Sequence, residues 1–353
     1  MNLAAVERIA KAVLYEGYML YPYRPSSVKN QQRWNFGVLC PPAYSELQSG
    51  SETSTMQTEC LVEGNGQTEL EIRLRFLQLV ERSIGELTTP AAELVSGESP
   101  EFRPVSKLEI DGRVYQTWQE ALEREVIVTA RTMASLIEAP LSLPFTFAAG
   151  KDLEEIRDGR GRIAGVILRD HQTLTGALEV NSEELGDRLF KIRVVIRNLS
   201  PFTAEPATRE AALPGSLIST HTVLGIRNGR FCSLLEPSES VRETAAGCQN
   251  VGTWPVLVGK EGDADTILSS PIILYDYPQI APESAGDLFD GTEIDEILSL
   301  RIMTLTDEEK REMRQSDERA REMLERTETL PAEQLMKLHG VLRNLRPLGE
   351  ETR

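Results

Sequence analysis

Three turn dipeptides, each set between two extended runs, constrain the fold of this chain most strongly. They are Asn65-Gly66, Asp111-Gly112 and Asn228-Gly229. Asn, Asp and Gly reach the positive φ angles of a type I′ turn at little cost, so such a pair between β-prone runs is typical of a tight hairpin. The sequence therefore predicts three antiparallel hairpins.

Further short strands are expected along the same part of the chain. Apolar, β-branched runs bounded by Gly, Asp or Pro occur at 161–170, 173–180, 187–202, 251–259 and 265–278. In the third run, apolar side chains recur with a period of two, at Phe190, Ile192, Val194 and Ile196. One face of that strand should be buried and the other solvated. Because no strand–helix–strand rhythm recurs, the pattern favours a β-sandwich-like antiparallel body over a doubly wound sheet.

Helices are expected mainly at the two ends. Residues 3–15 carry an amphipathic stripe with helical spacing, and 117–139 begins as a helix that changes into the β-branched run Val126 to Val128. Residues 292–344 are rich in Glu, Arg, Leu and Met, and Thr306 with Glu309 forms a capping box. The predicted fold class is α+β, with a mainly antiparallel β body and a C-terminal helical appendage.

The length of 353 residues suits two or three domains, at roughly 100–200 residues each. The composition shifts suggest an N-terminal helix with a β-rich domain over 1–205. A second β-rich segment over 206–290 would pack on the first or continue it. The helical appendage would occupy 291–353.

Net charge and apolar runs restrict the partners and the compartment. The 55 acidic and 38 basic residues give a net charge of −17, and a surface that negative repels phosphate backbones and anionic lipids. No run approaches the roughly 20 apolar residues of a membrane helix, and charged residues interrupt the place of a signal-peptide core. We expect no nucleic-acid partner, no membrane insertion and a cytoplasmic location. The four cysteines form no C-x-x-C pair, so free thiols are expected.

An aromatic and basic segment near the N-terminus is a candidate partner-binding surface. Tyr and Arg supply many of the dominant contacts at protein interfaces. The candidate residues are Tyr18, Tyr21, Tyr23, Arg24, Lys29, Arg33 and Trp34. Alternatively, this segment packs across the core as an edge loop.

An acidic region at 276–296 is a candidate cation site, since Ca²⁺ and Mg²⁺ prefer oxygen ligands. The residues of this reading are Asp276, Asp287, Asp290, Glu293 and His221. The spacing does not match an EF-hand. Alternatively, Asp290 or Thr292 caps a following helix, with Glu293, Asp295 and Glu296 in its first turn. His221 is flanked by Ser219, Thr220 and Thr222, but no G-x-S-x-G elbow accompanies it. No phosphate-binding loop has the required spacing, so no cofactor is expected.

Segments 14–39, 221–231 and 252–314 resemble a bacterial family associated with the gene clusters of uptake [NiFe] hydrogenases. The resemblance extends over most of the chain and rests on whole segments, not on a catalytic motif. It implies an accessory role in hydrogenase assembly, maturation or complex formation, and it carries over no catalytic residue. The chain has no His or Cys cluster of the kind that would favour nickel or iron delivery.

Two functions therefore stand as expectations. The first is a non-enzymatic, cytoplasmic accessory protein that binds a protein partner, such as a hydrogenase component. The alternative is a divalent-cation-dependent enzyme that uses the acidic 276–296 region.

Overall fold

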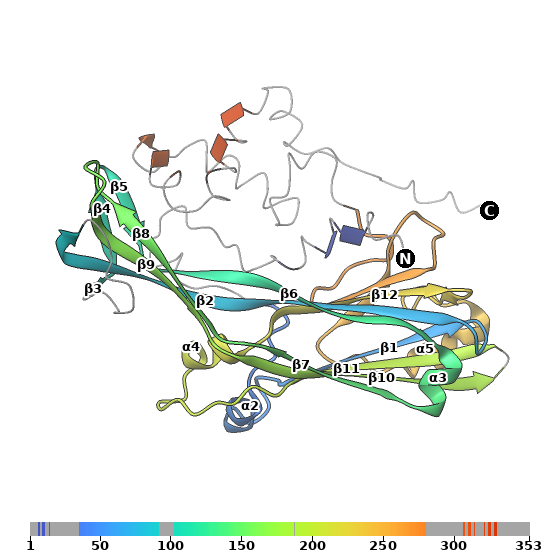
Figure 1. The fold of residues 1–353 in the computed structure, drawn as a ribbon. Helices are drawn as coiled ribbons and strands as arrows, with labels where there is room; N and C mark the ends of the chain where they lie inside the picture. The colour runs from blue at the N-terminus through green and yellow to red at the C-terminus, as the bar shows by residue number, and fades with distance from the viewer. Residues whose placement is uncertain are drawn as a thin grey trace, which may run out of the picture.

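The computed structural model describes residues 35–91, 102–186 and 188–279, together with single residues near both termini. These residues form mainly antiparallel β-structure in three sheets, with a few short helices (Figure 1). The predicted antiparallel β body is confirmed at this level. The predicted appendage over 291–353 lies almost wholly outside the described residues.

The first sheet has five strands in the order β13-β1-β11-β10-β7. Their bounds are Arg230–Phe231 for β13, Thr55–Glu63 for β1, Leu189–Asn198 for β11, Leu174–Gly186 for β10 and Leu141–Phe147 for β7. In β11 the even-numbered residues Phe190 to Ile196 are buried, as the period of two predicted.

The second sheet has eight strands, six of them in the order β14-β15-β12-β2-β9-β8, with β3 and β6 also paired to β2. Their bounds are Trp254–Leu257 (β14), Thr266–Ser270 (β15), Ile218–Arg227 (β12), Glu69–Ala91 (β2), Ile163–His171 (β9), Gly150–Arg157 (β8), Phe102–Val105 (β3) and Trp118–Thr132 (β6). A two-stranded sheet joins Lys107–Ile110 (β4) to Arg113–Gln116 (β5). The short α-helices are α2 (Pro42–Leu47), α3 (Met133–Glu138), α4 (Arg209–Ala212) and α5 (Arg242–Ala246).

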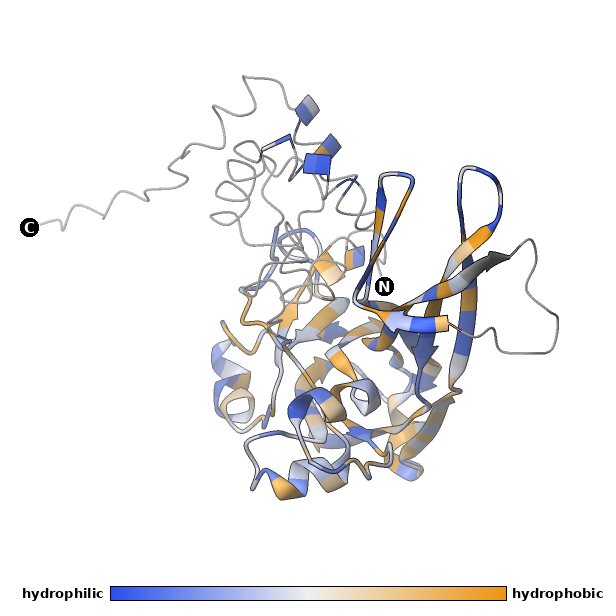
Figure 2. Ribbon diagram, turned by 90° about the vertical axis from the view of Figure 1, so that its left-hand side faces the viewer, coloured by the Kyte–Doolittle hydropathy of each residue, from blue (hydrophilic) through white to orange (hydrophobic). Residues whose placement is uncertain are grey.

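Strand β2 joins two halves of the molecule. Its 23 residues would span about 75 Å at the usual rise of a strand. On one edge it pairs first with β12 and, from Glu81 onward, with β9; on the other edge it pairs with β6 and then with β3. The far half, with β3, β8 and β9, projects beyond the five-stranded sheet (Figure 1). Hydrophobic and hydrophilic bands alternate along the strands in the turned view (Figure 2).

A bent hairpin connects the two large sheets. β8 pairs with β9 in the eight-stranded sheet, and β7 pairs with β10 in the five-stranded sheet. Only residues 148–149 separate β7 from β8, and only 172–173 separate β9 from β10. The two arms of this hairpin, β7–β8 and β9–β10, therefore pass from one sheet to the other at the same level. The Ala149 N–H donates to Thr173 Oγ1 at 3.0 Å across the bend.

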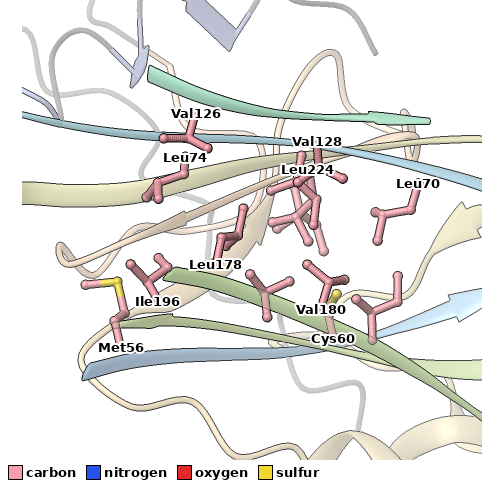
Figure 3. Close-up of a cluster of buried hydrophobic side chains, with 14 of the residues drawn as sticks. Met56, Cys60, Leu70, Leu74, Val126, Val128, Leu178, Val180, Ile196 and Leu224 are labelled. Carbon is pink, nitrogen blue, oxygen red and sulfur yellow. The ribbon is translucent and has the colours of Figure 1, made fainter. Parts of the chain in front are cut away.

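The main core lies between the two large sheets. Figure 3 shows Met56, Cys60, Leu178, Val180 and Ile196 of the five-stranded sheet facing Leu70, Leu74, Val126, Val128 and Leu224 of the eight-stranded sheet. All are buried. Burial of this apolar surface supplies most of the stabilisation of the two layers. A smaller cluster with Ile84, Leu108, Ile156 and Ile167 holds the β4–β5 hairpin against the far half of β2.

The prediction that a helix begins at 117 is wrong, because residues 118–132 form strand β6. β6 pairs with β2 from Glu69↔Thr132 to Arg82↔Trp118. Its inward side chains Val126 and Val128 enter the main core, while Glu125 forms ion pairs with Arg73 and Arg75 of β2. Pairing and burial along this length override the helix propensity of Gln, Glu, Ala and Leu. A helix begins only at Met133, where the Thr132 hydroxyl caps α3.

One of the three predicted hairpins is confirmed. Asp111 and Gly112 both have positive φ and close β4 onto β5, with Ile110 opposite Arg113. The other two are wrong as hairpins, since their flanking strands belong to different sheets. β1 pairs with β11 and β13, not with β2, and β13 pairs with β1, not with β12. Asn65-Gly66 and Asn228-Gly229 are therefore crossings between the two layers.

The two crossings pack against each other through Thr68. Its fully buried hydroxyl accepts a hydrogen bond from the Asn65 N–H at 2.9 Å and donates one to the Asn228 carbonyl oxygen at 2.8 Å. A Cβ at Gly229 would lie 2.6 Å from Thr68 Cγ2. Glycine is required there because the two crossings approach so closely.

We expect Thr68→Val to lower the free energy of unfolding by about 1–3 kcal/mol, since valine keeps the shape but leaves both hydrogen-bonding groups unpaired. Urea denaturation measures the change. The control is Thr146→Val, at an exposed position of β7, with an expected change within about 0.5 kcal/mol. Equal losses in the two variants would contradict the linking role of Thr68.

Candidate functional site

Most residues of the two predicted sites lie outside the described residues. This applies to all seven aromatic and basic candidates between Tyr18 and Trp34, and to Asp287, Asp290 and Glu293. Asp276 and His221 are described. Within the described part of the chain, no three His, Cys, Asp or Glu side chains lie together in a way that could hold a metal ion.

Asp276 holds together the segments beside β14. Its carboxylate accepts hydrogen bonds from the Ser233 hydroxyl at 2.6 Å and from the Leu257 N–H at 2.8 Å. The next residue, Tyr277, donates its N–H to the Leu257 carbonyl oxygen at 2.7 Å. These contacts give Asp276 a structural role in fixing the chain after β15 against β14.

His221 lies on β12 and is fully buried. Its Nδ1 donates a hydrogen bond to the Ser219 carbonyl oxygen at 2.8 Å. Burial lowers the pKa of His221 to about 4, with the Ser219 contact opposing the shift and Arg75 adding to it. The imidazole is therefore neutral near pH 7.

Four consecutive polar side chains around His221 are buried without hydrogen-bond partners among the described residues. They are Ser219, Thr220, His221 through its Nε2, and Thr222. The pairing of β12 with β2 is irregular between Ile218 and His221, and Ser219 has a φ of 53°. Such a bulge re-aims side chains and is common beside functional sites. Buried hydroxyls normally find partners, so this strand could hold ordered water or another small polar molecule.

A second polar group lies at the bend between the sheets, and we call Gln78, Arg124, Phe147 and His171 the bend cluster. Arg124 Nε donates to Gln78 Oε1 at 2.7 Å, and its guanidinium carbon lies 4.9 Å from the centre of the Phe147 ring. His171 Nε2 is 3.5 Å from Arg124 Nη2. Burial lowers the pKa of Arg124 from its usual value, but an arginine stays charged at physiological pH.

The charge of Arg124 has no carboxylate partner among the described residues. The neighbouring arginines of the same sheet are paired: Arg82 with Glu120, and Arg169 with Glu120 and Glu154. Arg75 pairs with Glu7 and Glu125. A half-buried cation without a counter-ion is able to bind an anion.

Large apolar side chains are exposed around β14, and we call Val251, Trp254, Ile273 and Tyr275 the β14 patch. Their exposed fractions are 53%, 43%, 73% and 86%. Trp254 lies opposite Ser270, whose hydroxyl donates to the Ile272 carbonyl oxygen at 2.8 Å. Ile272 and Leu274 pack on the sheet, so the alternating residues Ile273 and Tyr275 face away from it.

The four cysteines are free, as expected. Burial raises the pKa of Cys40, Cys232 and Cys248 to about 11, and it also raises that of the fully buried Cys60. Thiolates are the reactive form, so these thiols are poor nucleophiles near pH 7.

Sequence reasoning missed the bend cluster for a specific reason. Arg124 stands where the sequence pattern changes from helical to β-branched, and its contacts come from positions 78, 147 and 171 on three other strands. The β14 patch had a detectable signal, since Trp254 and Tyr275 stand in runs that were predicted as strands. Their exposure depends on the position of β14 at the edge of the eight-stranded sheet, which the sequence pattern does not reveal.

The fold and these sites define a mainly antiparallel β protein. A scan against protein-family models found no match, and a search of the curated proteins found none either. Among solved structures, the secretin InvG of the Salmonella SPI-1 type III secretion injectisome is 10% identical over 75% of this chain and 71% of that chain, with a TM-score of 0.09. A similarity that weak supports no statement about fold or function. None of the helices described is both long and apolar enough to cross a membrane.

We expect His221→Gln to reduce the pH dependence of stability. Below pH 6.5 the unfolded state takes up a proton at this histidine, whereas the folded state does so only near pH 4. The free energy of unfolding should therefore fall as the pH drops from 7 to 5, with about 2 kcal/mol of the loss due to His221. Urea denaturation at the two pH values measures it. The control is Thr222→Val, which alters a neighbouring buried group but no titrating one, and which should keep the wild-type difference in unfolding free energy between pH 7 and pH 5. If His221→Gln also kept that difference, the buried neutral state of His221 would be contradicted.

Proposed function

We propose that this chain is a non-enzymatic, cytoplasmic accessory protein that binds a protein partner, and that the partner is a component of a [NiFe] hydrogenase. In this proposal the two facing sheets are a rigid, β-sandwich-like body that presents a docking surface. The β14 patch is that surface.

The observation that carries the proposal is the exposure of the β14 patch. Tyr275 and Ile273 are the two most exposed large apolar side chains among the described residues. Trp254 is 43% exposed and lies opposite Ser270, the residue that ends β15 just before this segment. Exposed apolar groups gathered in one region mark interaction sites, and Trp and Tyr are the residue types that contribute most to binding energy. Trp254 stands on the paired strand β14, and hydrogen bonds of Asp276 and Tyr277 to Leu257 hold the chain just after Tyr275, so binding requires little ordering of the backbone.

Two further features support the choice of partner. The β14 patch falls within 252–314, one of the segments that resemble the hydrogenase-associated family, apart from Val251 at its border. The net charge of −17 would favour a partner with a basic rim around an apolar centre. The partner chemistry is therefore an apolar, partly basic surface of a hydrogenase subunit.

We expect the purified protein to bind an isolated large or small hydrogenase subunit of its own host, and the double variant Trp254→Ala, Tyr275→Ala to bind at least about tenfold more weakly. Calorimetry or surface plasmon resonance measures the affinity. The matched control is Leu47→Ala, which removes a 64% exposed side chain on α2 and should leave the affinity unchanged.

Two results would count against the proposal. Absence of binding to either hydrogenase subunit by the wild-type protein would overturn the choice of partner. Equal affinities for the wild type and the double variant would overturn the assignment of the docking surface.

A further inference from the structure

We propose that the bend cluster is a binding site for a carboxylate carried on an apolar body. Arg124 would hold the carboxylate, and Phe145, Phe147 and Leu122 would contact the apolar part. The inference is independent of the partner proposed for the β14 patch.

The guanidinium of Arg124 is held in place before any ligand arrives. Its Nε donates to Gln78 Oε1 at 2.7 Å, and Gln78 is fully buried. The Gln78 amide nitrogen in turn donates to the Gln172 carbonyl oxygen at 2.6 Å, at the bend between β9 and β10. A chain of two hydrogen bonds therefore fixes the side chain, and a ligand need not order it.

This arrangement leaves the two terminal nitrogens of Arg124 for a ligand. Nη1 has no hydrogen bond among the described residues, and Nη2 has only the 3.5 Å contact with His171. The two nitrogens lie in one plane and match the two oxygens of a carboxylate. The planar pairing suits a carboxylate, and a single guanidinium provides little for the further charge of a phosphate.

The charge of Arg124 also points to an anion. Within the described residues Arg82 and Arg169 share Glu120, and no carboxylate contacts Arg124. Burial beside Phe147 weakens the hydration of the guanidinium, so a bound carboxylate would replace lost water contacts.

Aromatic side chains lie on one side of Arg124, whose guanidinium carbon is 4.9 Å from the centre of the Phe147 ring. The rings of Phe76, Phe145 and Phe147 form a cluster with centroid distances of 5.7, 5.9 and 6.1 Å. Phe145 and Phe147 are only half-buried, because β7 is the edge of its sheet. Leu122 lies opposite Gln78 in the pairing of β6 with β2 and is 37% exposed. A ligand anchored at Arg124 can cover these surfaces.

His171 contacts the guanidinium of Arg124 at Nη2. Its ring lies over Gly150, where a Cβ would clash with the ring atom Cε1. The glycine thus permits the position that brings His171 Nε2 beside Arg124 Nη2. His171 is a positioning residue for the guanidinium.

The test uses 3-phenylpropionate as the probe, with 3-phenylpropanol as its neutral counterpart, in calorimetric and NMR titrations of the full chain. We expect saturable binding of the acid, and at least tenfold weaker binding of the alcohol. Arg124→Gln should weaken binding of the acid at least tenfold. Arg131→Gln, on the same strand at an exposed position, should bind as the wild type does.

If Arg124→Gln fails to fold, Arg124→Lys keeps the charge but removes the planar pair of nitrogens, and it should also weaken binding. Equal binding of the acid and the alcohol would overturn the role of the carboxylate. Sulfate that binds as tightly as the acid would show a general anion site and overturn the role of the apolar body. Absence of saturable binding of the acid would overturn the site.

Discussion

The pairing of β2 with four other strands is the constraint on which the rest of the structure depends. Along its first half, β12 and β6 flank it; along its second half, β9 and β3 do. Each of these four strands pairs with β2 along one of its own edges. The main core and the smaller cluster around Ile84 therefore share one continuous strand.

The same strand changes its surroundings where the five-stranded sheet ends. Phe76 still packs in the core, Gln78 is buried but polar, and Arg82 pairs with Glu120. The inward face thus gains polar and charged side chains within a few residues, at the level where the bent hairpin passes from one sheet to the other. The bend cluster forms at that transition, where a cation can be half-buried and still reach solvent.

Much of the strand content could be predicted from the sequence, because period-two burial is a local signal. β11 and the Asp111-Gly112 hairpin were predicted for the right physical reasons. The errors at 117–132, Asn65-Gly66 and Asn228-Gly229 share a cause, since the pairing partner of each segment is distant in the sequence. Arg124 could not be recognised as a site residue for the same reason. Its contacts are with Gln78, Phe147 and His171, which are distant from it in the sequence.

The most direct test of the central role of β2 is native-state hydrogen exchange of its amides, measured with increasing denaturant. If one strand unites the two halves, amides on both sides of the change from β12 to β9, such as Leu74 and Ile84, should exchange only through global unfolding and with the same free energy. A much lower free energy at Ile84 than at Leu74 would show that the far half opens separately, and it would contradict the account.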